Sequence, residues 1–200
     1  AFPASSGGCL AAAVWWGKRE KDNEPWADGA PHPVGQGGFY NGDGVTSMHH
    51  NSAGTRISPT EIWESKNPWL INKIELAQDS CGAGEFRGGL GLNLEFEMLE
   101  DTFITTVVER TKNPPWGIKH GLTGRANNVE VIKKSGKKFF MPKKSGYKLE
   151  KGDKIIFLTG GGGGYGDPKH RKVEKIKNDL KQGYLSKKFI RSHFHQFNME

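Results

Sequence analysis

Three charged residues, Asp79, Glu85 and Arg87, lie among five glycines in residues 79–91. Glycine-dense backbone makes a poor helix and a poor strand, and it occurs where the chain takes positive φ or lies close against another segment or a ligand. Charge held on such a backbone can bind a polar ligand, so residues 79–91 are a candidate binding loop. A bulged turn between two strands explains the same residues equally well, and both interpretations stay open.

A second candidate site begins at Glu109 and Arg110 and continues into the prolines at 114–115, Trp116 and Gly117. Prolines fix the backbone, and Trp116 offers a large rigid surface. The Arg110 guanidinium can bind a carboxylate or phosphate through two parallel hydrogen bonds. The pattern is typical of an anion site, while a structural ion pair between Arg110 and Glu109 remains an equal alternative.

The adjacent histidines His49 and His50 follow a tight turn predicted at 41–44. Imidazole titrates near neutrality, so one of these rings can act as a general base or as a metal ligand. No acidic residue follows at the spacing of a helical metal motif, and the two cysteines, Cys9 and Cys81, lack zinc spacing. The sequence therefore predicts no metal site from local residues, and its cysteine usage favours a reduced, cytoplasmic protein.

Residues 160–166 match G-x-G-x-x-G after a predicted strand, as a dinucleotide-binding turn would. Such a turn must open a helix whose N-terminus receives the pyrophosphate, whereas Asp167 and Pro168 follow here. No segment supplies the phosphate loop G-x-x-x-x-G-K-[ST], and no G-x-S-x-G elbow supplies a nucleophilic serine. If the protein works with ATP, we expect the nucleotide to be bound elsewhere.

The 200-residue chain has a formal net charge of +7, distributed very unevenly. Residues 1–110 carry 8 Lys and Arg against 15 Asp and Glu, whereas residues 111–200 carry 21 against 7. Such a dipole can steer an anionic ligand toward the second half or hold the halves together. Much of the excess lies in lysine doublets beside turns, which are typical of solvated hairpin ends, so nucleic-acid binding is not expected. The apolar run at 9–16 is too short to cross a membrane.

Hydrophobic periodicity predicts an α+β fold that is β-rich, with mostly antiparallel strands, glycine-rich loops and a C-terminal helical tail. Alternating patterns predict strands over 69–77, 92–98, 102–109, 129–133, 137–141 and 154–159. Residues 1–50 are interpreted as loop-rich and residues 114–128 as a loop, because glycine and proline punctuate them.

Helices are expected at three places. The first covers 58–66, with Ser58 as its cap and Glu61 completing a capping box. Apolar residues three and four apart predict a second helix that begins near Val173 and ends at Gly183, and Ser186 can cap a third. We accordingly divide the chain into a β-rich part, residues 1–168, and a helical tail, residues 169–200.

Several ordered motifs together are more specific than any one of them. They are Thr55-Arg56-Ile57, Glu61–Ser65, Asp79-Ser80-x-Gly82-x-Gly84-x-x-Arg87-Gly88-Gly89-x-Gly91, Glu109-Arg110 with Pro115-Trp116-Gly117, Gly161–Pro168, and Asp179-Leu180-x-x-Gly183-Tyr184-Leu185-Ser186. In this order they resemble the hydantoinase B/oxoprolinase family over nearly the whole chain. Cys81 stands where that family more often has glycine, so the resemblance does not predict a positive φ at this position.

The resemblance implies a B-type subunit that works beside an A-type partner, which binds ATP and phosphorylates the substrate. Such pairs hydrolyse cyclic amides such as hydantoins or 5-oxoproline, while the related acetone and acetophenone carboxylases carboxylate ketones. This chain resembles the C-terminal part of the family. Its expected partners are therefore the A-type subunit and the N-terminal part of a B-type subunit, which would hold the ligands of any divalent metal. A catalytically inert fragment or assembly module is the alternative outside enzyme chemistry.

Carried over to this sequence, the resemblance implies that Arg110 contacts an anion and that His49 transfers a proton. The residues expected to bind substrate are Asp79, Ser80, Arg87, Glu109, Gly163 and Asp167. The glycine segments would in addition donate backbone N–H groups to an oxyanion.

Overall fold

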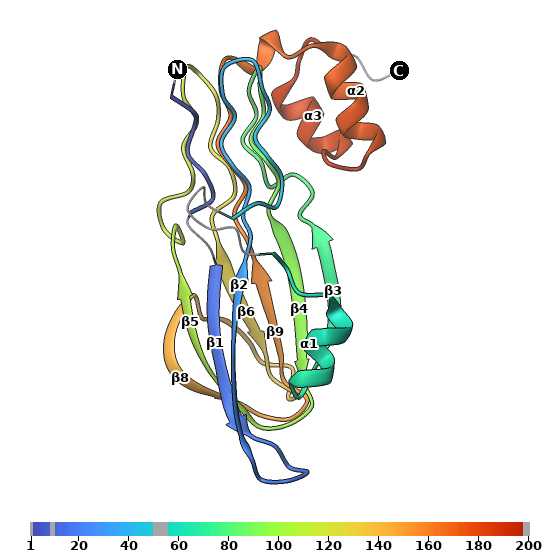
Figure 1. The fold of residues 1–200 in the computed structure, drawn as a ribbon. Helices are drawn as coiled ribbons and strands as arrows, with labels where there is room; N and C mark the ends of the chain where they lie inside the picture. Colours follow the sequence, from blue (N-terminus) through green and yellow to red (C-terminus); the bar gives the residue numbers. More distant parts are fainter. Residues whose placement is uncertain (1, 9–10, 50–55, 198–200) are drawn as a thin grey trace.

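Two antiparallel sheets packed face to face form the body of the protein (Figure 1). The computed structural model describes residues 2–8, 11–49 and 56–197. The four-stranded sheet has the order β2-β1-β5-β8, with β1 at Ala11–Lys18, β2 at Pro25–His32, β5 at Thr102–Val108 and β8 at Lys143–Leu149. The five-stranded sheet has the order β3-β4-β9-β6-β7, with β3 at Trp69–Leu76, β4 at Leu92–Met98, β9 at Lys154–Leu158, β6 at Asn128–Ile132 and β7 at Lys138–Phe140. The predicted β-rich α+β fold is confirmed.

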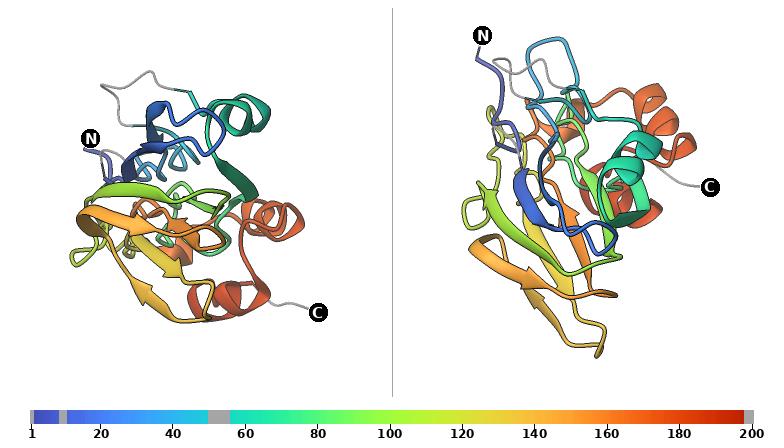
Figure 2. Two further views of the ribbon diagram at one scale, coloured as in Figure 1. Left: turned by 90° about the horizontal axis from the view of Figure 1, so that it is seen from below. Right: turned by 60° about the horizontal axis from the view of Figure 1, so that its bottom comes forward.

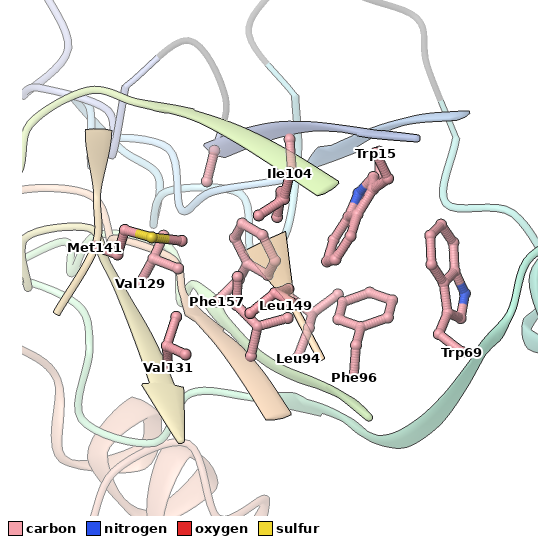
Figure 3. Packing of buried hydrophobic residues seen from close by; sticks show 14 of the residues in the cluster. Trp15, Trp69, Leu94, Phe96, Ile104, Val129, Val131, Met141, Leu149 and Phe157 are labelled. Carbon is pink, nitrogen blue, oxygen red and sulfur yellow. The ribbon is translucent and has the colours of Figure 1, made fainter. Parts of the chain in front are cut away.

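The main core lies between the sheets, where inward side chains of both interdigitate (Figure 3). Trp15 and Ile104 point from the four-stranded sheet toward Phe96 and Phe157 of the five-stranded sheet, and all four are fully buried. The Trp15 ring centroid lies 5.5 Å from that of Phe96 and 5.9 Å from that of Phe157. Burying each side chain of this size contributes about 1.5–3 kcal/mol, so this layer fixes how the sheets face each other.

Strand predictions are confirmed for β3, β4, β5, β6, β7 and β9, each within one residue of its expected ends. Residues 1–50, interpreted as loop-rich, contain the strands β1 and β2, which the sequence does not predict, and neither does it predict β8. β2 and β8 are the edges of their sheet, where proline, glycine and lysine are tolerated. β1 gives no period-two signal because its outward residues are as apolar as its inward ones.

The helices lie near β3, on the side of the sandwich away from β8 (Figures 1 and 2). They are α1 (Thr60–Lys66), α2 (Val173–Lys181) and α3 (Lys187–His193), with a 3₁₀ turn, η1 (Pro168–His170), before α2. The predicted Ser58 cap is wrong, because α1 begins after Pro59 with no side-chain cap. The Ser186 cap is confirmed, since its Oγ accepts the Phe189 N–H at 3.1 Å. None of the described helices is long and apolar enough to span a membrane.

Extended glycine-rich segments run side by side beyond the strands, at the end of the sandwich opposite the β1–β2 turn (Figure 1). We call this array the glycine bundle; its segments are residues 4–7, 34–38, 80–91, 115–124 and 160–165. Backbone hydrogen bonds join the segments. The Gly162 N–H donates to the Gly89 carbonyl at 2.9 Å, and the Gly82 N–H donates to the Gly162 carbonyl at 2.8 Å. Main-chain pairing therefore holds the bundle together.

Residues 160–164 lie at the centre of the glycine bundle, and residues three positions apart in this segment pack against the same neighbouring segment. A Cβ added to Gly161 or Gly164 would meet residues 80–83, and one added to Gly162 would lie 2.7 Å from the Gly37 nitrogen. A period of three is that of a polyproline II helix, and only glycine fits where helices of this kind pack so closely. None of the five glycines in residues 79–91 has positive φ, and neither has Cys81. Close backbone approach is therefore what requires the glycines there.

The C-terminal helices pack on residues 81–90 of the glycine bundle through a second apolar cluster. Its buried members are Cys81, Ala83, Leu90, Ile176, Leu185, Ile190 and Phe194. A buried ion network reinforces the contact: Arg171 makes two hydrogen bonds to Asp43, at 2.7 and 3.0 Å, and one to Asp179 at 2.6 Å. Arg87 donates to the same Asp179 carboxylate at 3.0 Å. The tail thus packs on the β-rich part through both apolar and ionic contacts.

Apart from Lys18 at the end of β1, the outer face of the four-stranded sheet carries no ionisable side chain on β1, β2 and β5. Its other outward residues are Ala12, Val14, Trp16, Ala27, Gly29, Pro31, Phe103, Thr105 and Val107. The outer face of the five-stranded sheet is ordinary by comparison, since Glu95 and Glu97 pair there with Lys154. A large face with so little charge is typical of an interaction surface.

Candidate functional site

A surface depression of about 590 Å³ lies beyond the end of β5. Its lining residues are Glu109, Arg110, Thr111, Lys112, Asn113 and Trp116, from the loop after β5, and Lys143 from the start of β8. The pairing of Val107 with Lys143 in the sheet explains why these two segments meet. The structure thus brings the predicted Glu109, Arg110 and Trp116 together and adds Lys143, which the sequence did not indicate.

Arg110 is held in an unusual backbone conformation within this depression. Its φ of 49° lies in the left-handed region that residues other than glycine rarely adopt. The Arg110 guanidinium stacks over Trp116, with its carbon 4.7 Å from the ring centroid. The cation is therefore presented beside an aromatic surface.

Asn127 fixes the backbone around Arg110. The Asn127 N–H donates to the Arg110 carbonyl at 3.2 Å, and its Nδ2 donates to the Glu109 carbonyl at 2.9 Å. Its Oδ1 accepts the Gly160 N–H, which ties the same loop to the glycine bundle. Sequence reasoning missed Asn127, because nothing in Arg125-Ala126-Asn127-Asn128 shows which amide turns inward.

His49 lies in a separate, buried place beside His32. Both imidazoles lack a hydrogen-bond partner among the described residues, and the antiparallel bridge between Val34 and Met48 brings them near each other. Burial lowers the pKa of His49, so its ring is neutral at pH 7. Burial, with the neighbouring His49 as a second cause, lowers the pKa of His32 to about 3. No contact joins His49 to Arg110 in the described part of the chain.

Two residues of the 79–91 loop that were expected to bind substrate make local structural contacts. The Asp79 carboxylate accepts the Ser186 N–H at 2.7 Å, at the start of α3. Ser80 Oγ donates to the Ala77 carbonyl at 2.7 Å and accepts the Gly91 N–H at 3.0 Å. These contacts fix the two ends of the loop and anchor α3.

Arg87 and Gly163 also use their polar atoms inside the protein. Arg87 is buried against Asp179 in the ion network described above. The Gly163 N–H donates to the Ser5 carbonyl at 2.8 Å, and its carbonyl accepts the Gly38 N–H at 2.9 Å. The N–H groups of residues 160 and 162–166 likewise bond to other protein atoms, so the expected oxyanion donors are wrong for these positions.

The remaining candidates give no further cluster. The Asp167 carboxylate accepts the Lys169 N–H at 2.9 Å at the start of η1, which lowers the pKa of Asp167. Burial raises the pKa of the free Cys81 thiol to about 12, which makes it a poor nucleophile. In the ranges that the structure describes, no three His, Cys, Asp or Glu side chains are placed to hold a metal ion. His50, Thr55 and Cys9 lie outside the described residues.

Comparison with known proteins identifies the family. The model of the family described as hydantoinase B/oxoprolinase matches residues 1–168. The chain belongs to this family. The B component of a putative D-/L-hydantoinase from Pseudomonas sp. is 31% identical over 153 residues, which are 76% of this chain and 26% of that protein. The family resemblance drawn from the motifs is therefore confirmed.

Two solved structures share the fold. An ATP-dependent caprolactamase from Pseudomonas jessenii superposes with a TM-score of 0.78 and 25% identity, covering 94% of this chain and 34% of that one. A nucleotide-free acetone carboxylase gives a TM-score of 0.76 at 17% identity, covering 94% of this chain and 30% of that one. The chain spans 26% of the Pseudomonas hydantoinase component and 10–14% of the 5-oxoprolinases it matches.

Proposed function

We propose that this chain is the C-terminal part of a B-type subunit in an enzyme that opens cyclic amides at the expense of ATP. The observation that carries the proposal is the match of 94% of the chain, at a TM-score of 0.78, to an ATP-dependent caprolactamase. Because the chain covers only 34% of that protein, activity requires the N-terminal part of a B-type subunit as well.

In the proposed reaction an A-type partner binds ATP and transfers its γ-phosphoryl group to the amide oxygen. Water then adds to the activated carbon, and the ring C–N bond breaks as the nitrogen takes up a proton, which leaves an acyl phosphate. A second water hydrolyses the acyl phosphate and releases phosphate and the ring-opened acid. The absence of a phosphate loop from the sequence supports a nucleotide site in the partner. Ligands for any divalent metal would lie in the N-terminal part of the B-type subunit, and the assembly would be cytoplasmic.

Within this chain, the depression at Arg110 is the proposed contact for the anionic substrate. Trp116 supports the Arg110 guanidinium from one side, and Glu109 lines the same depression. His49 is the proposed proton-transfer group, because its buried neutral imidazole can accept a proton. Neither Asp79 nor Ser80 is proposed to touch substrate, since their side chains anchor α3 and close the loop.

The test is reconstitution with the other parts of the enzyme. The chain is combined with an A-type subunit, the N-terminal part of a B-type subunit, ATP and either 5-oxoproline or hydantoin. We expect ADP release and ring opening that require the chain, and a mixture without the chain is the control. Equal turnover with and without the chain would contradict the proposal and favour an inert module. Bicarbonate-dependent consumption of acetone would assign the chain to ketone carboxylation, for which the acetone carboxylase likeness provides a shared fold alone.

A further inference from the structure

We infer that the depression formed by Arg110, Lys112, Lys143 and Trp116 binds a phosphoryl dianion, the group that ATP delivers to the substrate. The identity of the natural ligand rests on the proposed function, whereas the anion site itself rests on the geometry of this chain. Lys112 and Lys143 extend the site beyond the single arginine that the motif suggested.

The first argument is uncompensated charge. Three cations and one carboxylate, Glu109, line the depression, giving it a net charge of +2. By contrast, Lys133 contacts two carboxylates, those of Asp153 and Glu150. Neither Lys112 nor Lys143 forms an ion pair within the described residues. A dianion would neutralise the depression, whereas a single carboxylate would leave it positive.

The second argument is the fixed orientation of Arg110. A residue other than glycine in the left-handed region costs about 1–2 kcal/mol, and such strain persists where the surrounding structure imposes it. Here Asn127 imposes it through hydrogen bonds to the carbonyls of both Glu109 and Arg110. The planar guanidinium presents donors in a fork that matches phosphate oxygens, and the lysines add point charges from either side.

Trp116 supplies the third argument. Its side chain is 52% exposed even though Arg110 stacks on it, so part of the indole remains open to a ligand. An exposed tryptophan beside a phosphate site can carry the apolar ring of a small phosphorylated substrate. The same surface can carry a nucleotide base, so a phosphoryl group of ATP is the second possible source of the ligand.

The experiment is a titration of the whole chain at pH 7.5 and constant ionic strength, followed by isothermal calorimetry and tryptophan fluorescence. The probes are inorganic phosphate, phenyl phosphate, acetate and ATP. At this pH phosphate monoesters are largely dianionic, since their second pKa is about 6. We expect saturable binding of phosphate and tighter binding of phenyl phosphate, with acetate weaker than either by about tenfold or more.

Substitutions test whether phosphate binds in the depression. Arg110→Gln and Lys143→Gln should each weaken phosphate binding about tenfold or more, and Arg110→Lys should restore only part of the loss. Lys138→Gln is the matched control, because Lys138 is an exposed lysine of β7 outside the depression. Lys143→Gln keeps the test available if Arg110→Gln fails to fold. Equal affinity in wild type, Arg110→Gln and Lys143→Gln would overturn the inference.

The probes also separate the two sources of the ligand. ATP binding that exceeds phenyl phosphate binding and depends on Arg110 would overturn the assignment to substrate and indicate a nucleotide site. All these measurements need no turnover. A failed reconstitution with intact phosphate binding would therefore count against the proposed reaction and leave the anion site standing.

Discussion

Replacing Gly162 by alanine tests whether close backbone packing holds the glycine bundle together. The added Cβ would lie 2.7 Å from the Gly37 nitrogen and nearer still to the Gln36 carbonyl, against 3.4–4 Å for ordinary contact. Even for the nitrogen alone the backbone must move by about 0.7 Å, the difference between 2.7 and 3.4 Å. Both neighbours are main-chain atoms, so no flexible side chain can yield. We therefore expect the central segment to separate from one of the segments beside it.

The magnitude follows from the hydrogen bonds that such a displacement breaks. The Gly162 N–H bonds to Gly89 and its carbonyl to Gly82, at 2.9 and 2.8 Å, and Gly162 is buried. Each buried polar group left without its partner costs about 1–3 kcal/mol. With two bonds at risk, Gly162→Ala should lower the free energy of unfolding by about 2–6 kcal/mol.

Gly29→Ala is the matched control for this substitution. A Cβ at Gly29 would meet nothing within 4 Å, and the φ of Gly29 is not positive. Alanine there should change stability by less than about 1 kcal/mol, in the stabilising direction, because it restricts the unfolded chain. Urea unfolding followed by circular dichroism and tryptophan fluorescence measures both variants. Equal midpoints and slopes for Gly162→Ala and wild type would refute the argument that backbone contact fixes the bundle.

Three further predictions address the ion network, the buried histidine and the outer face of the four-stranded sheet. Arg171→Leu removes the cation shared by two carboxylates and should cost about 3–5 kcal/mol, seen as faster trypsin cleavage within the C-terminal helices. As pH falls from about 6.5 toward 3, the unfolded state protonates His32 while the folded state does not, so stability should fall by up to about 1.4 kcal/mol per pH unit. His32→Phe should remove this component from the pH dependence of the urea midpoint. Val14→Lys, at a side chain 48% exposed, should leave stability within about 0.5 kcal/mol of wild type but reduce binding of an apolar dye.

Specific outcomes would contradict each of these. Unchanged cleavage in Arg171→Leu would mean that the apolar cluster and the Arg87–Asp179 pair dock the tail without Arg171. An identical pH profile in His32→Phe would mean that other groups dominate acid unfolding. Unchanged dye binding in Val14→Lys would place the accessible apolar surface elsewhere on the protein.

The sequence predicted the strands whose two faces differ in polarity. β4 alternates buried apolar residues with Asn93, Glu95 and Glu97, so its period of two was visible. β1 was invisible because Val14 and Trp16 point outward and are as apolar as the inward Trp15. For edge strands β2 and β8 composition misleads, since unpaired edges accept proline and lysine.

Less of the candidate site could be predicted, because a sequence motif does not show which residues its side chains contact in the fold. Arg87 was a reasonable binding candidate in sequence, yet its partner Asp179 lies in a helix 92 residues away. Arg110 and Trp116 lie six positions apart in the chain, and their stacking could be inferred from local chemistry. Lys143 could not, because it reaches the depression through strand pairing that was not predicted.

The sandwich and the glycine bundle should contribute with opposite signs to the heat-capacity change of unfolding. Heat capacity rises on unfolding mainly through newly hydrated apolar surface, while hydration of peptide groups lowers it. The sandwich, with its tryptophans and phenylalanines, supplies the first contribution, and the bundle supplies mostly the second. Calorimetry should therefore give a smaller heat-capacity increment than chain length alone suggests. Backbone hydrogen bonds hold the bundle together, whereas hydrophobic stabilisation weakens on cooling. The bundle should therefore keep more of its stability at low temperature than the aromatic core does.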